Sequence, residues 1–383
     1  MKQSHYFSHA SKPPQRRGPV AIAKTRVLGR GGLRLEAPDG VLWLLLMVLL
    51  GVFCLAGPAR AADSPTQLEI PEPWVFLNPD SISFAVIRAR QDDDGFKSLL
   101  DTAWKALKSS KSPATTGVMG ILLRIIQGDS SNGLISFLPL QMVRVDSLDP
   151  ETELPHPTLA VTVSGWGGLQ TPLYAVMSRD KEGKPYPTQD LEDATLVLRE
   201  GWKDPSRSHV LTRVKGTFIA FPTVQKAEAA VKSMVAKNPA RPKGELSDLL
   251  TSLDAGRDTY GVLLNRKGSL IKFLTWLNKG EVNRAIAVVG QERMDSVMSK
   301  VSSMTWEGEL LSDNEMNFFI RFQTASPEAR KELAILLKEV REVLNGIGRA
   351  GEMKTTGIGS ELQVDFTMTG YRDMVTNYIS SSV

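Results

Sequence analysis

An unbroken apolar run from Val41 to Leu55 divides this 383-residue chain into two very different parts. A basic stretch that is almost free of acidic residues precedes the run, and small residues follow it. Ala59 and Ala61 form the small-x-small pattern that signal peptidase reads. A charged region, a short apolar region and such a site, in this order, predict a secretory signal that is cut after Ala61. The folded protein would then begin at residue 62.

The same run has an alternative interpretation, as a membrane anchor formed by residues 41–57. A spanning helix needs about 20 consecutive apolar residues, and this run is shorter. Pro58 and Arg60 also end it abruptly. We therefore expect a periplasmic or secreted protein, in contact with a membrane only through an uncleaved signal segment.

The basic character of the chain belongs to this leader. Residues 1–61 hold nine of the 46 basic residues and two of the 42 acidic ones, so the remainder has a slight excess of acid. The sequence pI of about 9.0 is therefore no argument for nucleic-acid binding, and we expect none. The single cysteine, Cys54, also lies in the leader, so the exported chain would be cysteine-free and stabilised without disulfides.

The remaining pattern predicts an α+β fold built on antiparallel sheet, with helices packed on one face. Short β-branched and apolar segments recur between Gly, Pro and Asp, as expected for hairpin-connected strands. Helices are indicated by 3.6-residue periodicity and by start signals such as Ser326-Pro327-Glu328. The predicted strands are 82–90, 134–145, 158–164, 173–178, 195–199, 209–215, 217–222, 259–265, 304–311, 315–324 and 361–368. The predicted helices are 96–107, one from Thr223, 269–277, 281–301, one from Ser326 and 371–379.

Four segments follow from this pattern. Residues 1–61 are the basic region with the signal peptide, and residues 62–80 are a tether rich in Pro and acid. Residues 81–236 form a first α+β half, and residues 246–383 form a second. Both halves run strand, helix, antiparallel strands and helix, so we expect either one large domain or two related lobes. Residue identity between the halves is poor.

Motifs that would indicate an enzyme do not withstand inspection. Gly346–Gly351 spells G-x-G-x-x-G, but it follows a predicted helix and precedes a strand, the reverse of a dinucleotide site. It is better explained as a helix C-cap. Asp92–Gly95 lacks the spaced ligands of a calcium loop. After residue 61 the chain has only two histidines, His156 and His209, which are far apart, and no cysteine, which argues against zinc. We expect no cofactor and no bound metal.

Paired carboxylates remain the nearest approach to a catalytic arrangement. Glu307 and Glu309 share one face of a predicted strand next to Trp306, and two carboxylates can hydrolyse glycosides. The favoured interpretation is the exposed face of a hairpin, with Trp306 directed inward.

The best candidates for contact with a ligand or partner are Trp166, Gly165, Gly167 and His209. Trp166 lies between glycines in a predicted loop between strands, where an exposed Trp can anchor a partner or a sugar. It can equally fold back onto the sheet. His209 follows Ser206 and Ser208, but no nucleophile elbow accompanies them.

These observations favour an exported, non-enzymatic binding or scaffold protein. Its partner could be a protein, a glycan or an apolar ligand. Two alternatives stay open: an extracytoplasmic hydrolase whose catalytic residues are dispersed along the chain, and a carrier that holds an apolar ligand in an internal cavity.

Overall fold

The computed structural model of the protein describes thirteen ranges of the chain. These ranges are 71–90, 94–109, 140–148, 155–163, 178–179, 183–198, 210–214, 216–236, 241–271, 288–312, 314–346, 350–370 and 372–373.

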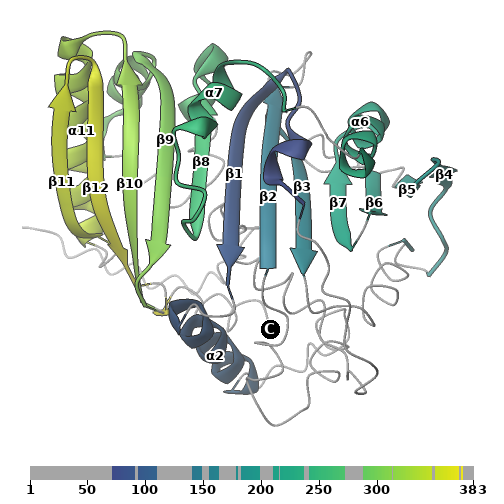
Figure 1. Ribbon diagram of the computed structural model, residues 1–383. Helices are drawn as coiled ribbons and strands as arrows, with labels where there is room; N and C mark the ends of the chain where they lie inside the picture. Colours follow the sequence, from purple (N-terminus) through teal and green to yellow (C-terminus); the bar gives the residue numbers. More distant parts are fainter. Residues whose placement is uncertain are drawn as a thin grey trace, which may run out of the picture. The chain divides into compact units, whose positions relative to one another are not determined.

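Twelve strands in these ranges form one open sheet (Figure 1). Every pairing between neighbours is antiparallel. The order is β11-β12-β10-β9-β8-β1-β2-β3-β7-β6-β5-β4. The α+β class and the antiparallel sheet are confirmed. The strands are β1 (Ser81–Ala89), β2 (Leu140–Leu148), β3 (Pro155–Val163), β4 (Thr188–Asp190), β5 (Thr195–Leu198), β6 (Val210–Val214), β7 (Thr217–Phe221), β8 (Thr259–Leu264), β9 (Val301–Leu310), β10 (Glu315–Thr324), β11 (Ala350–Ile358) and β12 (Glu361–Thr369).

The helices of the described ranges are short apart from two. The longest is α11 (Pro327–Gly346), which begins as expected: the Ser326 hydroxyl accepts a hydrogen bond from the Ala329 amide at 3.2 Å. The others are η1 (Pro73–Phe76), α2 (Asp94–Ser109), α6 (Val224–Val235), α7 (Glu245–Thr251), η2 (Arg266–Gly268) and α10 (Gln291–Met298).

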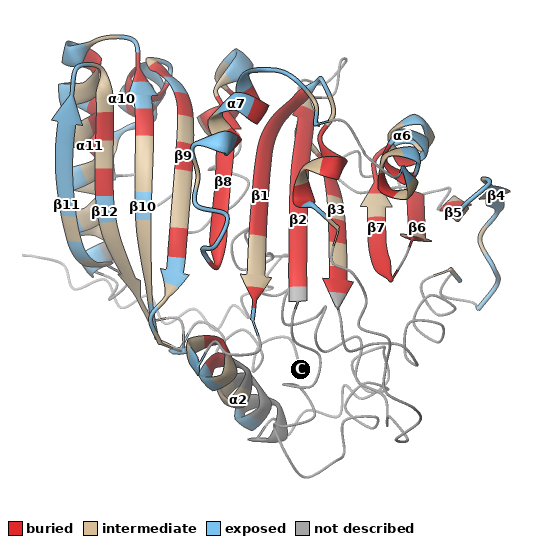
Figure 2. Ribbon diagram, viewed as in Figure 1, coloured by how far each residue is buried: buried red, intermediate tan, exposed pale blue. Residues whose placement is uncertain are grey.

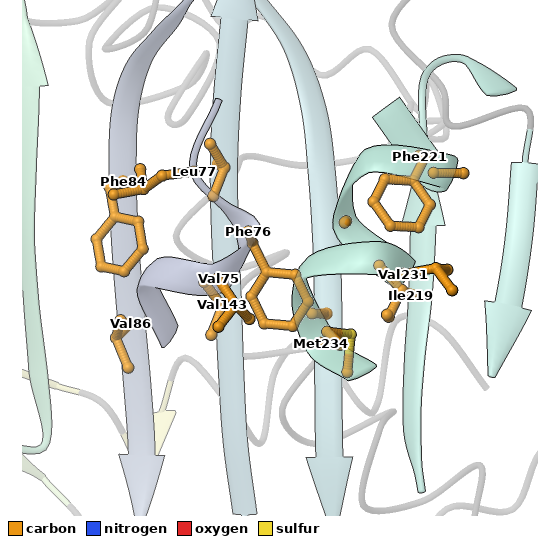
Figure 3. Close-up of a cluster of buried hydrophobic side chains, with 14 of the residues drawn as sticks. Val75, Phe76, Leu77, Phe84, Val86, Val143, Ile219, Phe221, Val231 and Met234 are labelled. Atoms are coloured by element: carbon orange, nitrogen blue, oxygen red, sulfur yellow. The ribbon is translucent and has the colours of Figure 1, made fainter. Parts of the chain in front are cut away.

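One hydrophobic core lies on the face of the sheet from which Phe84, Val143 and Val262 project. We call this side the first face. The 3₁₀ helix η1, α6 and α7 pack on it. In Figure 3, Phe76 of η1 lies next to Met234 of α6, and Val231 of α6 lies beside Ile219. This core therefore joins strands of the first half to β8 on the first face.

A second core lies on the opposite side, which we call the second face. Leu263 belongs to this core, whereas its neighbours Val262 and Leu264 belong to the first one. Because successive side chains of a strand point to opposite faces, the two cores flank the sheet on opposite sides. Phe322 and Val364 join Leu263 there, under α10 and α11.

The prediction of helices on one face of the sheet is therefore wrong for the sheet as a whole. Of the helices in the described ranges, η1 and α6 cover the first face of the first half, and α10 and α11 cover the second face of the second half. The physical reason is that each strand near the centre has apolar side chains at both odd- and even-numbered positions, and therefore on both faces of the sheet. Such a strand can bury either face, so its alternation does not select one.

The two halves meet in a single pairing at the centre of the sheet. Strand β1 pairs with β8 through five residue pairs, from Ser83–Leu263 to Ile87–Thr259. Outward from this pairing the order is β1-β2-β3-β7-β6 on one side and β8-β9-β10-β12-β11 on the other. Leaving out β4 and β5, the two sides have the same order of first, second, third, fifth and fourth strand. Both halves thus contribute to one continuous sheet.

Candidate functional site

The first face of β9, β10, β12 and β11 has no helix of the described ranges packed on it. Figure 2 shows β11 mainly in pale blue and β9, β10 and β12 in a mixture of tan, red and pale blue, with α11 behind β11 and β12. We call it the open face. It is assembled from cross-strand rows: Glu307, Phe319, Asp365 and Lys354 form one row, and Thr305, Arg321, Gln363 and Thr356 form the next.

The alternation of β9 and β10 explains why this surface is polar. Trp306 and Phe322 point to the second face and contact its core. Their chain neighbours Glu307, Arg321 and Gln323 therefore point to the open face. The predicted orientation of the hairpin is confirmed, with Trp306 inward and the two glutamates outward.

The open face carries more acid than base. The strand pairings place six carboxylates and two basic side chains on it. The acidic residues are Glu307, Glu309, Glu315, Glu352, Glu361 and Asp365, and the basic ones are Arg321 and Lys354.

Three of the carboxylates have a cationic partner. Arg321 lies 3.1 Å from Glu307, and Lys354 lies 3.2 Å from Glu352. Arg257, from the loop before β8, pairs with Glu309. No salt bridge within the described ranges involves the other three carboxylates, so the surface keeps a local negative potential. These three are Glu315, Glu361 and Asp365.

An aromatic ring lies among these charges. Phe319 is 37% exposed. The guanidinium carbon of Arg321 lies 5.8 Å from the centre of its ring, within the range of a cation–π contact. Because Arg321 is also fixed by Glu307 and by the Ser252 carbonyl, Phe319 is held on a firm support. A rigid ring in a polar surround is typical of contact surfaces.

The paired carboxylates Glu307 and Glu309 do not form a catalytic pair. Each is paired with its own arginine. A positive charge beside a carboxylate favours its ionised form, which has no proton to donate as a general acid. The geometry therefore supports an electrostatic role on the open face for both residues.

Beside the open face, Tyr260 is cross-strand partner to Glu307 and almost fully buried. Burial raises the pKa of its phenol, and the nearby Arg88 guanidinium, 5.6 Å from the ring centre, acts in the opposite direction. At neutral pH the phenol is protonated. Tyr260 belongs to the core of the first face and is not positioned as a base.

The most strongly buried charges of the described ranges lie elsewhere, on the second face of β1 and β2. Arg144 donates to both oxygens of Asp146, and the Ser83 hydroxyl also donates to that carboxylate. The Asp146 side chain is fully buried. A carboxylate whose lone pairs are engaged in this way is a structural group.

Other kinds of site lack support within the described ranges. They hold no group of three or more His, Cys, Asp or Glu side chains that could bind a metal ion. None of their helices is long and apolar enough to cross a membrane. The glycine motif follows α11 and leads into β11, so it has the wrong order for a dinucleotide site.

The contact residues predicted from the sequence lie outside the described ranges. This applies to Gly165, Trp166, Gly167 and His209, and also to the cleavage residues Ala59 and Ala61. Those predictions stay untested. Sequence inspection did not single out Phe319, Arg321, Asp365 or Lys354. Alternation along residues 315–324 shows which side chains share a face, but not that this face is free of helices.

Comparison with protein-family models, with curated proteins and with solved structures finds no match to this chain. The open face is therefore interpreted from its own geometry and charge.

Proposed function

We propose that this chain is an exported, non-enzymatic binding or scaffold protein, and that the open face is its recognition surface. The observation that carries the proposal is the exposed ring of Phe319 on a rigid, acidic sheet surface without a covering helix. Regular structure supplies a surface that loses little conformational entropy on binding, which favours affinity.

The charge of the open face defines the partner. Asp365 is exposed, and Glu361 and Glu315 flank it on the same surface without a cation. Complementary potentials accelerate encounter and select partners. We therefore propose a protein partner that presents basic side chains around an apolar group, which would sit on Phe319.

Photocrosslinking tests this surface. A photoreactive amino acid would replace Phe319, and a matched control would carry it at Ile335, which is 55% exposed on α11 at the other side of the sheet. We expect one basic protein to crosslink at position 319 and not at 335. After purification of that partner, Asp365→Lys should weaken binding by about tenfold or more. Glu342→Lys, a charge reversal at an exposed position of α11, should leave the affinity unchanged.

Two outcomes would overturn the assignment. Equal crosslinking at positions 319 and 335 would show that Phe319 is ordinary exposed surface. A partner whose affinity does not respond to Asp365→Lys would bind through another face of the protein. In either case the function would have to be sought among the residues outside the described ranges, such as Trp166.

Export is the second part of the proposal. The apolar run 41–55 and the Ala59-x-Ala61 pattern support it. The intact mass of the native protein from separated soluble and membrane fractions tests it. A soluble species that begins at Ala62 is expected. A membrane-bound species that retains residues 41–57 would instead establish an anchor.

We further propose that the two halves are related by internal duplication. The matching strand order on both sides of the β1–β8 pairing supports this relationship. A chain that contains only residues 246–383 would test whether the second half can fold alone.

A further inference from the structure

The outer edge of β11 is the longest bare strand edge in the described ranges. β11 has nine residues and lies at one end of the sheet, whereas β4 at the other end has three. Its residues Lys354 to Ile358 are all exposed, and Ile358 is 71% exposed. An edge of this kind is a template for another strand.

The hydrogen-bond pattern shows which backbone groups of β11 point outward. In an antiparallel ladder, alternate residues bond to the strand on one side and to the strand on the other. The Thr324 amide bonds the Ser360 carbonyl, so even-numbered residues of β12 face β10 and odd-numbered ones face β11. Their partners on β11 are Lys354, Thr356 and Ile358. The N–H and C=O groups of Met353, Thr355 and Gly357 therefore point away from the sheet.

The edge also lacks most devices that discourage strand addition. It contains no proline, and its register irregularity lies between Ala350 and Met353, before the regular part of the strand. The charge of Lys354 is balanced by Glu352 at 3.2 Å. Two copies of this edge can therefore approach without net repulsion.

We propose that β11 pairs with β11 of a second copy of this chain, antiparallel and about a two-fold axis at Thr355. Thr355 then faces its counterpart, and Met353 faces Gly357 of the other copy. The outward groups of these three residues form the new backbone hydrogen bonds. On the open face, Lys354 lies opposite Thr356.

Within one chain, two sheet halves are already joined edge to edge by an antiparallel strand pairing. Its two halves join through the antiparallel β1–β8 pairing, with the same strand order on each side. A two-fold axis normal to the sheet also keeps each face on its own side. The open faces of the two copies would therefore lie on the same side of one continuous sheet and present a doubled acidic surface. The pairing does not depend on the function proposed above.

Sedimentation equilibrium tests the association. The exported chain should show a concentration-dependent rise from monomer to dimer mass. Thr355→Pro should abolish the dimer and leave the melting temperature almost unchanged, because the amide that it removes points to solvent. Lys354→Glu should also give monomer, since each edge then carries two carboxylates. The swap Glu352→Lys with Lys354→Glu should restore the dimer.

Disulfide trapping tests the register. Residues 62–383 contain no cysteine, so in the pairing proposed Thr355→Cys places the two new thiols across a hydrogen-bonded pair, about 5.5 Å apart between Cα atoms. Ile358→Cys is the matched control, because it lies on the same strand but far from its own counterpart. We expect oxidation at 355 to be at least tenfold faster. A wild-type chain that stays monomeric at several hundred micromolar, or equal oxidation rates at the two positions, would overturn the proposal.

Discussion

The guanidinium of Arg144 and the carboxylate of Asp146, two residues apart on β2, form a fully buried ion pair at 2.6 Å on the second face of the sheet. Burying two charges costs solvation free energy, and the pair offsets this cost only while both members are present. Ser83, on the neighbouring strand β1, completes the set of donors to the carboxylate. This triplet ties β1 to β2 next to the central pairing of the sheet.

Removing one member of this triplet should destabilise the protein far more than replacing all three members together. We expect Asp146→Ala to lower the free energy of unfolding by about 3–5 kcal/mol, because it leaves a buried guanidinium without its carboxylate. The combined change Arg144→Met, Asp146→Leu and Ser83→Ala should recover more than half of that loss. Urea denaturation of the three proteins measures this. If the combined variant is as unstable as Asp146→Ala, the contacts of Arg144 with other groups dominate.

A methyl group cannot be added at Gly261 in the centre of the sheet. A Cβ there would lie 2.2 Å from the Trp306 side chain and 2.5 Å from the Phe84 carbonyl oxygen. Gly261→Ala should therefore lower the stability by about 3 kcal/mol or more, since backbone must move. Gly256→Ala is the control, because only the flexible Asp254 side chain is near it. Thermal unfolding compares the two. Similar melting temperatures would show that the Trp306 ring can turn away at little cost.

The buried phenol of Tyr260 should make the protein sensitive to alkaline pH. Its pKa is raised from the usual 10.0, chiefly by burial. A folded-state pKa above the unfolded value gives stability that is complete below pH 10 and is lost as the pH rises through the folded pKa. Tyr260→Phe should therefore lose less stability than wild type between pH 9 and pH 11. Urea unfolding at both pH values measures the difference, and parallel losses would contradict the assignment.

The helix α6 depends on its N-cap residue, Thr223. Thr223 has extended backbone, and its hydroxyl accepts a hydrogen bond from the Lys226 amide at 3.3 Å. Thr223→Ala should cost about 1 kcal/mol, whereas Thr223→Ser should retain the cap. Since α6 covers the first-face core, the loss should appear in global unfolding followed by tryptophan fluorescence. Equal effects of the two substitutions would show that the Thr223 methyl group matters more than its hydroxyl.

Periodicity predicted most of the elements that the structure describes. The strand at 82–90, the hairpin at 304–324 and the caps at Thr223 and Ser326 are confirmed as β1, β9–β10, α6 and α11. These elements are encoded locally, because alternation, helical spacing and capping hydroxyls act within a few residues. For the same reason, the sequence alone indicated that the glycine motif Gly346–Gly351 follows a helix.

Strand β11 was not predicted from the sequence. Its residues Gly351, Lys354 and Gly357 interrupt the apolar alternation of a buried strand, because its outer edge and one of its faces meet solvent. Pairing with β12 makes it a strand. The helix expected over 281–301 also differs, since Gly290 has φ 93° before α10 and β9 already begins at Val301.

The sequence by itself determined the antiparallel α+β class, the identity of most elements and which side chains of each strand share a face. The tertiary structure decided which face each half covers with helices, that both halves join in one sheet, and that β11 ends it. The physical reason is the range of the interactions involved. Alternation and capping are local, whereas helix placement and edge exposure depend on contacts between residues far apart in the chain. The open face and the bare edge could therefore be recognised only once β9, β10, β12 and β11 were seen side by side.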